Sequence, residues 1–147
     1  MESNLKTLNG GNIKSMSLLV GIHVNSVLSK DDKLTKEVDN RIYPLVIPEG
    51  APRYPFIVFG SSGISPTDTK DGSCEDNVSI SVVVIAKTYF SAIQIAQIVR
   101  YDLESVSGKY DEFEVTDCVL SGSSESYLQE IDAFSVELYF NIKTIDY

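Results

Sequence analysis

Hydrophobic and polar residues alternate along two long stretches of the chain, with the period of two that is typical of β-strands. In residues 78–87 one face is apolar throughout, whereas the other face begins with serines and ends with Val83 and Ile85. In residues 133–145 the alternation is regular and predicts a strand with one buried and one solvated face. The apolar end of the second face in residues 78–87 predicts that something covers the sheet there.

Apolar residues recur at helical spacing in two other places. The first stretch predicts a helix from Ser15 to Lys30, with Ser15 or Ser17 as its N-cap, and Asp31 offers a cap for a short second helical piece. Thr88 is placed to cap a long amphipathic helix, for which Gly108 is the expected stop. The apolar stripe of that helix comprises Ala92, Ile95, Ala96, Val99, Leu103 and Val106.

Prolines and glycines divide the region between these helices. Residues 41–47 and 55–60 read as extended pieces joined by the turn Pro48-Glu49-Gly50-Ala51-Pro52, because proline fixes φ and glycine accepts positive φ. Residues 61–76 contain several turn-forming residues and predict a long exposed loop or a hairpin tip.

Two further strands are predicted at residues 112–119 and 133–145, separated by Gly122 and a serine cluster. The predicted order is therefore helix, three strands, helix, two strands. Short connections favour a mostly antiparallel sheet with the two main helices packed on one face, an α+β fold of the two-layer sandwich type. Polar residues 1–14 are expected to form a flexible arm, and residues 15–147 a single α+β domain.

Composition narrows the class of protein. The chain has 147 residues, of which 43% are hydrophobic, which favours a globular protein over a disordered one. The net charge is −9 and the lysines are interrupted by acidic residues, so direct nucleic-acid binding is not expected. No apolar run has the length of a membrane span, and no secretory signal begins the sequence, which favours a cytoplasmic protein.

Candidate chemistry is sparse. The only histidine, His23, lies in an apolar helical pattern without a motif that would give it a nucleophile. The two cysteines, Cys74 and Cys118, are far apart and read as free thiols. The acidic residues of the 61–76 segment lack the register of a calcium loop and read as a solvated tip. We therefore expect no catalytic residue, no metal and no cofactor.

Several short segments together resemble the tail-completion, or tail-terminator, proteins of long-tailed bacteriophages and prophages. These segments are RIYP from Arg41, the proline turn after it, YPFIVF from Tyr54, and the helix start Tyr89-Phe90-Ser91-Ala92. The resemblance extends from about Leu18 to Lys143. It implies a structural subunit, without enzymatic activity, that forms a homo-oligomeric ring, expected to be a hexamer.

Such a ring would close the head-proximal end of the tail tube and join it to the head connector. The implied partners are further copies of this chain, the tail tube protein and a head-completion or connector protein. The implied locations are the cytoplasm of the bacterial host during assembly and the tail of the virion.

Candidate interface residues follow from the predicted faces and edges. Val83 and Ile85 lie on the sheet face opposite the helices, and Tyr54 and Phe56 lie in the YPFIVF segment. Two acidic residues of the 61–76 segment, Asp68 and Asp71, are candidates for projecting toward a partner.

Two other classes remain open. One is a small module of the same shape that binds a small ligand or a protein in a bacterial cell, which would need a deep apolar pocket. The other is an enzyme whose site assembles from scattered serine, tyrosine and aspartate side chains. That reading would need a titratable group with a strongly shifted pKa in a cleft.

Overall fold

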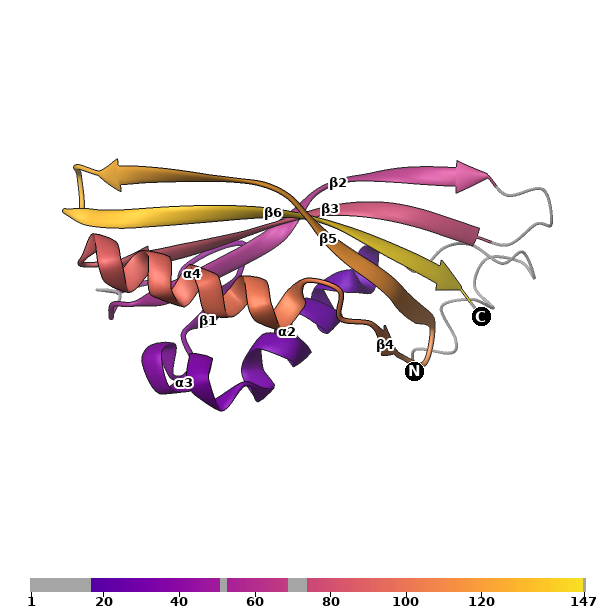
Figure 1. Ribbon diagram of the computed structural model, residues 1–147, viewed down its shortest axis with the longest axis horizontal. Helices are drawn as coiled ribbons and strands as arrows, with labels where there is room; N and C mark the ends of the chain where they lie inside the picture. Colours follow the sequence, from indigo (N-terminus) through magenta and orange to yellow (C-terminus); the bar gives the residue numbers. More distant parts are fainter. Residues whose placement is uncertain (1–16, 51–52, 69–73, 147) are drawn as a thin grey trace.

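The computed structural model describes residues 17–50, 53–68 and 74–146 (Figure 1). The predicted arm at residues 1–14 and the interface candidate Asp71 lie outside these ranges. Asp68 ends a strand whose backbone is described.

The described residues form one 3₁₀ helix, three α-helices and six β-strands. The helical elements are the 3₁₀ helix η1 (Ser17–Val20) and the α-helices α2 (Gly21–Lys30), α3 (Asp32–Val38) and α4 (Tyr89–Leu103). The strands are β1 (Ile42–Pro44), β2 (Phe56–Asp68), β3 (Cys74–Ala86), β4 (Gly108–Lys109), β5 (Phe113–Leu128) and β6 (Ala133–Asp146). The α+β class is therefore confirmed.

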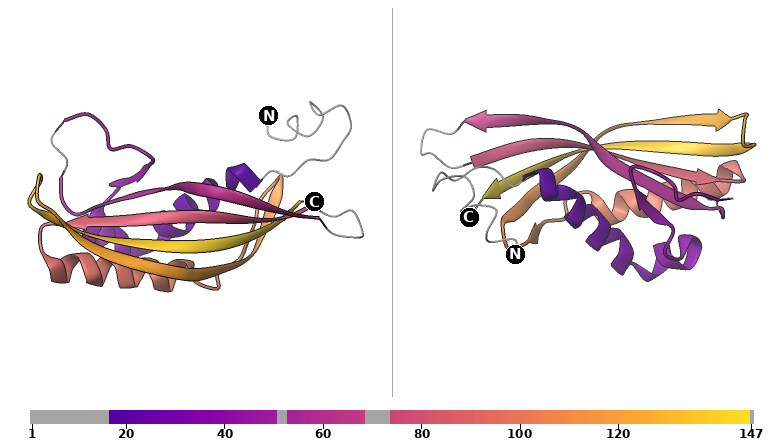
Figure 2. Two further views of the ribbon diagram at one scale, coloured as in Figure 1. Left: turned by 90° about the horizontal axis from the view of Figure 1, so that it is seen from above. Right: turned by 180° about the vertical axis from the view of Figure 1, so that it is seen from behind.

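The sheet differs from the predicted one in its topology and shape. It has six strands in the order β1-β2-β3-β6-β5-β4, and β1 runs parallel to β2, whereas every other pair is antiparallel. The sheet is curled like half a barrel, and the helices lie together on one side of it (Figures 1 and 2). The predicted two-layer sandwich of five strands and two main helices is thus replaced by a curled mixed sheet of six strands with three α-helices, in which all pairs except β1–β2 are antiparallel as predicted.

The main core lies between the helices and the sheet. The face of β3 that was predicted to be apolar throughout is buried there, as is the alternating apolar face of β6. Five of the six predicted stripe residues of α4 are buried, and Thr88 caps this helix by accepting a 3.2 Å hydrogen bond from the Ser91 amide. The predicted stop at Gly108 is wrong, because α4 ends at Leu103 and Ser105 already has a positive φ of 64°.

Two segments contain more strand than predicted. Of the two alternatives for residues 61–76, a loop or a hairpin tip, the hairpin is correct, because β2 extends to Asp68 and pairs with β3, which begins at Cys74. Gly122 and the serine cluster lie inside β5 rather than between two strands. Glycine and serine have low strand propensity, but their backbone groups are satisfied here by the ladder with β6, and this tertiary pairing overrides the local preference.

Both long outer strands contain β-bulges, and each bulged residue is a serine or threonine. The extra residues are Ser62 in β2 and Thr116 and Ser121 in β5. Each side-chain hydroxyl donates to a carbonyl of the neighbouring strand, at 3.2, 3.3 and 3.1 Å respectively. Since a bulge disrupts the backbone ladder, these hydroxyl groups replace hydrogen bonds that the ladder loses.

A second, smaller cluster covers one end of the opposite sheet face. Phe56, Ile85 and Ala133 are buried in it, with Tyr54 and Val83 packed at its margin. The Tyr54 and Phe56 rings lie 5.4 Å apart, and Lys87 Nζ lies 4.7 Å from the centre of the Tyr54 ring. The cover predicted for the apolar end of β3 is therefore supplied by residues of the same chain.

The second cluster should contribute substantially to stability. Replacing the fully buried Phe56 in Phe56→Ala removes most of its apolar contacts and leaves a cavity, so the free energy of unfolding should fall by about 3–5 kcal/mol. Urea denaturation followed by circular dichroism measures the change. The exposed Tyr101→Ala serves as control and should change stability by no more than about 0.5 kcal/mol. Equal stability of the two variants would contradict the proposed role of the cluster.

Candidate functional site

His23 is a core residue of helix α2 rather than a catalytic base. Its side chain is fully buried, and Nδ1 shares a 2.7 Å hydrogen bond with the Tyr110 hydroxyl. Burial lowers the pKa of His23 to about 4, so the ring is neutral at pH 7. Nε2 has no hydrogen-bond partner among the described residues. The position gives the ring no access to a substrate, and a structural role accounts for its contacts.

Cys118 is likewise buried, as expected of a structural thiol. Burial raises its pKa to about 12, with smaller contributions from the carboxylates of Asp117 and Glu104. The thiol is therefore protonated and unreactive at neutral pH.

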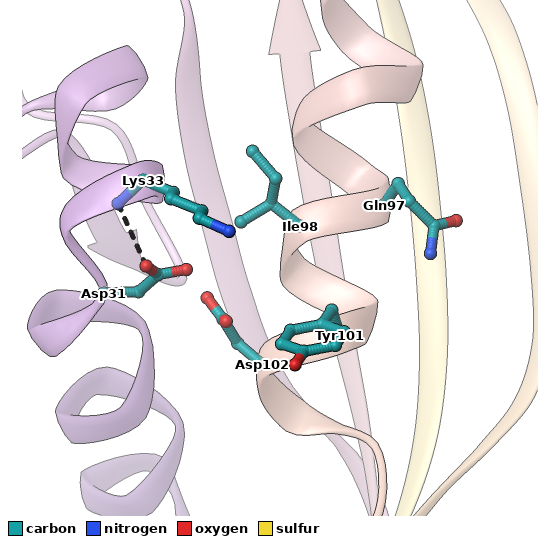
Figure 3. A pocket seen from close by; sticks show the side chains of 6 residues that line it. All are labelled: Asp31, Lys33, Gln97, Ile98, Tyr101 and Asp102. Atoms are coloured by element: carbon teal, nitrogen blue, oxygen red, sulfur yellow. Dashed lines mark hydrogen bonds between the residues drawn. The ribbon is translucent and has the colours of Figure 1, made fainter.

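A pocket of about 290 Å³ lies between the junction of α2 with α3 and the last turns of α4 (Figure 3). The carboxyl groups of Asp31 and Asp102 face each other across it. Asp31 caps α3 by accepting a 2.9 Å hydrogen bond from the Lys33 amide. The lining residues are Asp31, Lys33, Gln97, Ile98, Tyr101 and Asp102.

Each carboxyl group shifts the pKa of the other. Asp102 Oδ2 is buried and finds no donor among the described residues while both groups are ionised. Burial, followed by the hydrogen bond and charge of Asp31, raises the pKa of Asp102 to about 7. The same hydrogen bond is the main cause that lowers the pKa of Asp31. A proton on Asp102 therefore donates to Asp31 and links α4 to the start of α3.

A shifted pKa in a pocket is the feature that an enzyme or ligand-binding reading would need. None of the six lining side chains is a serine, cysteine or histidine, and the titratable groups of the pocket are Asp31, Lys33, Tyr101 and Asp102. The pair already has a structural task, because it joins two helix ends. Within the described ranges, no three histidine, cysteine or acidic side chains gather as metal ligands.

No helix in the described part of the chain is both long enough and apolar enough to cross a membrane. A further feature with functional potential is the pair of sheet edges.

The outer edge of β2 is covered only at its start. β1 pairs with Ile57, Val58 and Phe59, and the Leu45 amide donates a 2.9 Å hydrogen bond to the Phe59 carbonyl. Beyond that point, residues 60–68 have no further strand beside them in the described structure. This half of β2 thus leaves backbone donors and acceptors open to an incoming strand, except at Pro66, which has no amide donor.

The outer edge of β5 is covered at the opposite end of the molecule. β4 pairs with Glu114 and Val115, and the amide of Ser105 donates a 2.7 Å hydrogen bond to the Cys118 carbonyl. Residues 121–128 have no strand on their outer side within the described ranges. Six of these eight residues are exposed, and the stretch contains neither lysine nor proline, which commonly block edge pairing.

The predicted interface residues divide into two groups. Tyr54, Phe56, Val83 and Ile85 come together in the second cluster, where Phe56 and Ile85 are buried within this chain. Asp68 lies at the far end of β2, away from that cluster. The free half of β5 was missed, because its serines and glycine were read as a connection. The bulge at Ser121 interrupts the alternation of residues in this part of β5, so the sequence pattern did not reveal a strand there.

The acidic pair makes stability depend on pH. The folded-state pKa of Asp102 lies above its ordinary value of 3.8, so the contribution of the proton on Asp102 is present at low pH and is lost as pH rises through about 7. Asp102→Asn mimics the protonated group, so it should be more stable than the parent at pH 8, by about 1–2 kcal/mol after allowance for solvent screening, and the difference should shrink toward pH 5. Denaturant titrations at both pH values test this. The exposed Asp111→Asn is the control; a pH-independent difference for Asp102→Asn would contradict the raised pKa of Asp102.

Comparisons with known proteins gave a family match and a similar solved structure. Residues 23–145 match the family described as Tail completion protein gp17. Among solved structures, a chain of the virion of a native gene transfer agent (GTA) particle shares the fold, with a TM-score of 0.74 and 14% identity over 83% of this chain and 91% of that chain. No curated protein sequence matches. Since the family match spans most of the chain, the protein belongs to the tail completion protein gp17 family.

Proposed function

We propose that this chain is a structural subunit of a phage or prophage tail. It assembles into a homo-oligomeric ring, closes the head-proximal end of the tail tube, and joins the tube to the head connector. The observation that carries the proposal is the family match over residues 23–145. The protein acts by binding other proteins and needs neither an enzymatic reaction nor a cofactor.

The two sheet edges support a ring. They lie on opposite sides of the sheet and differ in sequence, so contact between them in two copies is heterologous. A heterologous contact closes into a ring when its rotation permits, and otherwise it extends into a filament. The proposed ring is a hexamer that meets the tail tube protein on one side and the connector protein on the other.

The likeness to a chain of a GTA particle is compatible with a place in a virion tail. Assembly in the host cytoplasm precedes incorporation into the particle. The net charge of −9 suits a soluble subunit that meets partners with basic faces. The alternative function is that of a module that binds a small ligand or a protein. The feature that favours this alternative is the pocket between Asp31 and Asp102.

The proposal predicts closed rings in solution or on a tail tube. Light scattering across a concentration series, with negative-stain images of any large species, should detect a ring of uniform mass, expected to contain six copies. The same measurement is repeated with the purified tail tube protein of the same phage or prophage, so that a ring that forms only on the tube as a template is also detected. A chain that stays monomeric and binds no tube would contradict the proposal and favour the binding-module alternative.

The exposed margin of the second cluster gives a further test. Val83 is half-buried, so Val83→Lys can place its amine in solvent and the subunit should stay folded. If this face borders an interface, ring formation should weaken by tenfold or more. Circular dichroism checks folding and light scattering checks association. Unfolding would assign Val83 to the internal core, and unchanged association would remove this face from the interface.

A further inference from the structure

The chain turns sharply after β1 and exposes three consecutive aliphatic residues. Leu45, Val46 and Ile47 are 73%, 74% and 38% exposed. The Val46 amide donates a 2.7 Å hydrogen bond to the Pro44 carbonyl, and Leu45 between them has a φ of 64°. We call residues 44–47 the aliphatic turn.

The aliphatic turn is costly for an isolated subunit. A non-glycine residue with positive φ in a turn closed between residues i and i+2 is strained, by about 1–3 kcal/mol. The amide of Leu45 itself donates a hydrogen bond to the Phe59 carbonyl of β2, and this bond holds the turn against the sheet. Gly60 makes room for it, because a Cβ there would lie 2.5 Å from Leu45 Cδ2. A fixed, strained turn that exposes Leu45, Val46 and Ile47 is suited to enter a recess on another molecule.

A recess lined by both apolar and polar side chains lies at the opposite edge of the sheet. It is a cavity of about 160 Å³ between α4 and the free half of β5. Ala96, Val136 and Leu138 are nearly fully buried and form its apolar floor together with Ile93. Gln97, Arg100, Leu120, Ser123 and Glu125 complete the lining. We call this cavity the α4–β5 groove.

The aliphatic turn and the groove lie at the same level along the strands. Pro44 pairs with Phe59, Phe59 with Val82, Val82 with Leu138, and Leu138 with Ser123. One cross-strand row therefore begins beside the turn and ends in the groove. Rotation about a closed ring's axis involves no shift along that axis. Where the strands run along the axis, a neighbouring copy brings its turn to this groove at the correct height.

Charged side chains lie near both surfaces. The groove carries Arg100 and Glu125, and the exposed residues Glu49 and Arg53 follow the turn in the sequence. Arg100 forms a 3.1 Å salt bridge with Glu104, and Glu125 accepts a 2.9 Å hydrogen bond from the Tyr89 hydroxyl, so a contact here depends on the aliphatic side chains and on the register of the strands.

We propose that the aliphatic turn of one copy inserts Leu45 and Val46 into the α4–β5 groove of the next copy. The inference rests on the proposed ring and assigns the surfaces through which its subunits meet. Contact hides aliphatic area that the free subunit exposes, and a turn held in its bound conformation loses little freedom on association.

The first test changes the turn without changing the fold. Val46→Asp places a charge in the groove of the neighbour, so the concentration needed for association, alone or on the tail tube, should rise at least tenfold. Leu18→Asp is the matched control, because Leu18 is a similarly exposed leucine, at 79%, on another element. Circular dichroism should show both variants folded. Rings of Val46→Asp that form as readily as those of the control would overturn the inference and leave the ring itself intact.

The second test detects the contact directly and does not require a stable ring. Val46→Cys and Ser123→Cys are prepared as separate chains, mixed at the highest attainable concentration, and oxidised. A disulfide-linked dimer should form in the mixture far more than in either variant alone or in the parent with its own cysteines. A dimer from one variant alone would indicate a symmetric contact, and no dimer in the mixture would overturn the inference. Failure of the proposed function would appear separately, as the absence of any association in the parent chain.

Discussion

The packing of α4 against the two central strands is the interaction on which the rest of the structure depends. β3 and β6 form an uninterrupted ladder, and the buried residues of α4, among them Ile95 and Val99, contribute to the core that lies against them. Each such fully buried side chain stabilises the fold by about 1.5–3 kcal/mol relative to an exposed one. Because the central strands are fixed in this way, β2 and β5 can leave long parts of their edges without a partner strand among the described residues.

The sequence predicts this central unit well. The period of two in residues 133–145 and the apolar face of residues 78–87 placed the correct side chains in the core. The apolar stripe and the Thr88 cap predicted the position of α4. The stripe is a clear signal because the buried residues of α4 recur along one face of the helix. Both signals are strong because long elements with one buried side require regular spacing.

The outer strands were harder to predict, because propensity and pairing disagree there. The serines and glycine of β5 favour turns when judged alone, and only the ladder with β6 makes them a strand. The parallel partner β1 is three residues long and ends at a proline, so it offers hardly any periodic signal. Nor could sequence spacing bring Asp31 to Asp102, because their approach depends on how α3 and α4 pack. The positive φ of Leu45 is equally invisible in the sequence, since leucine seldom adopts it.

The three bulges also contribute to the curvature of the sheet. All of them add residues to β2 and β5, whereas β3 and β6 pair without any interruption. A bulge bends its strand and increases the local twist, so bulges in the strands on either side of a regular central pair favour a curled sheet over a flat one. In this protein a few hydroxyl-bearing residues, each bonded to the adjacent strand, thus influence the form of a surface many times their size.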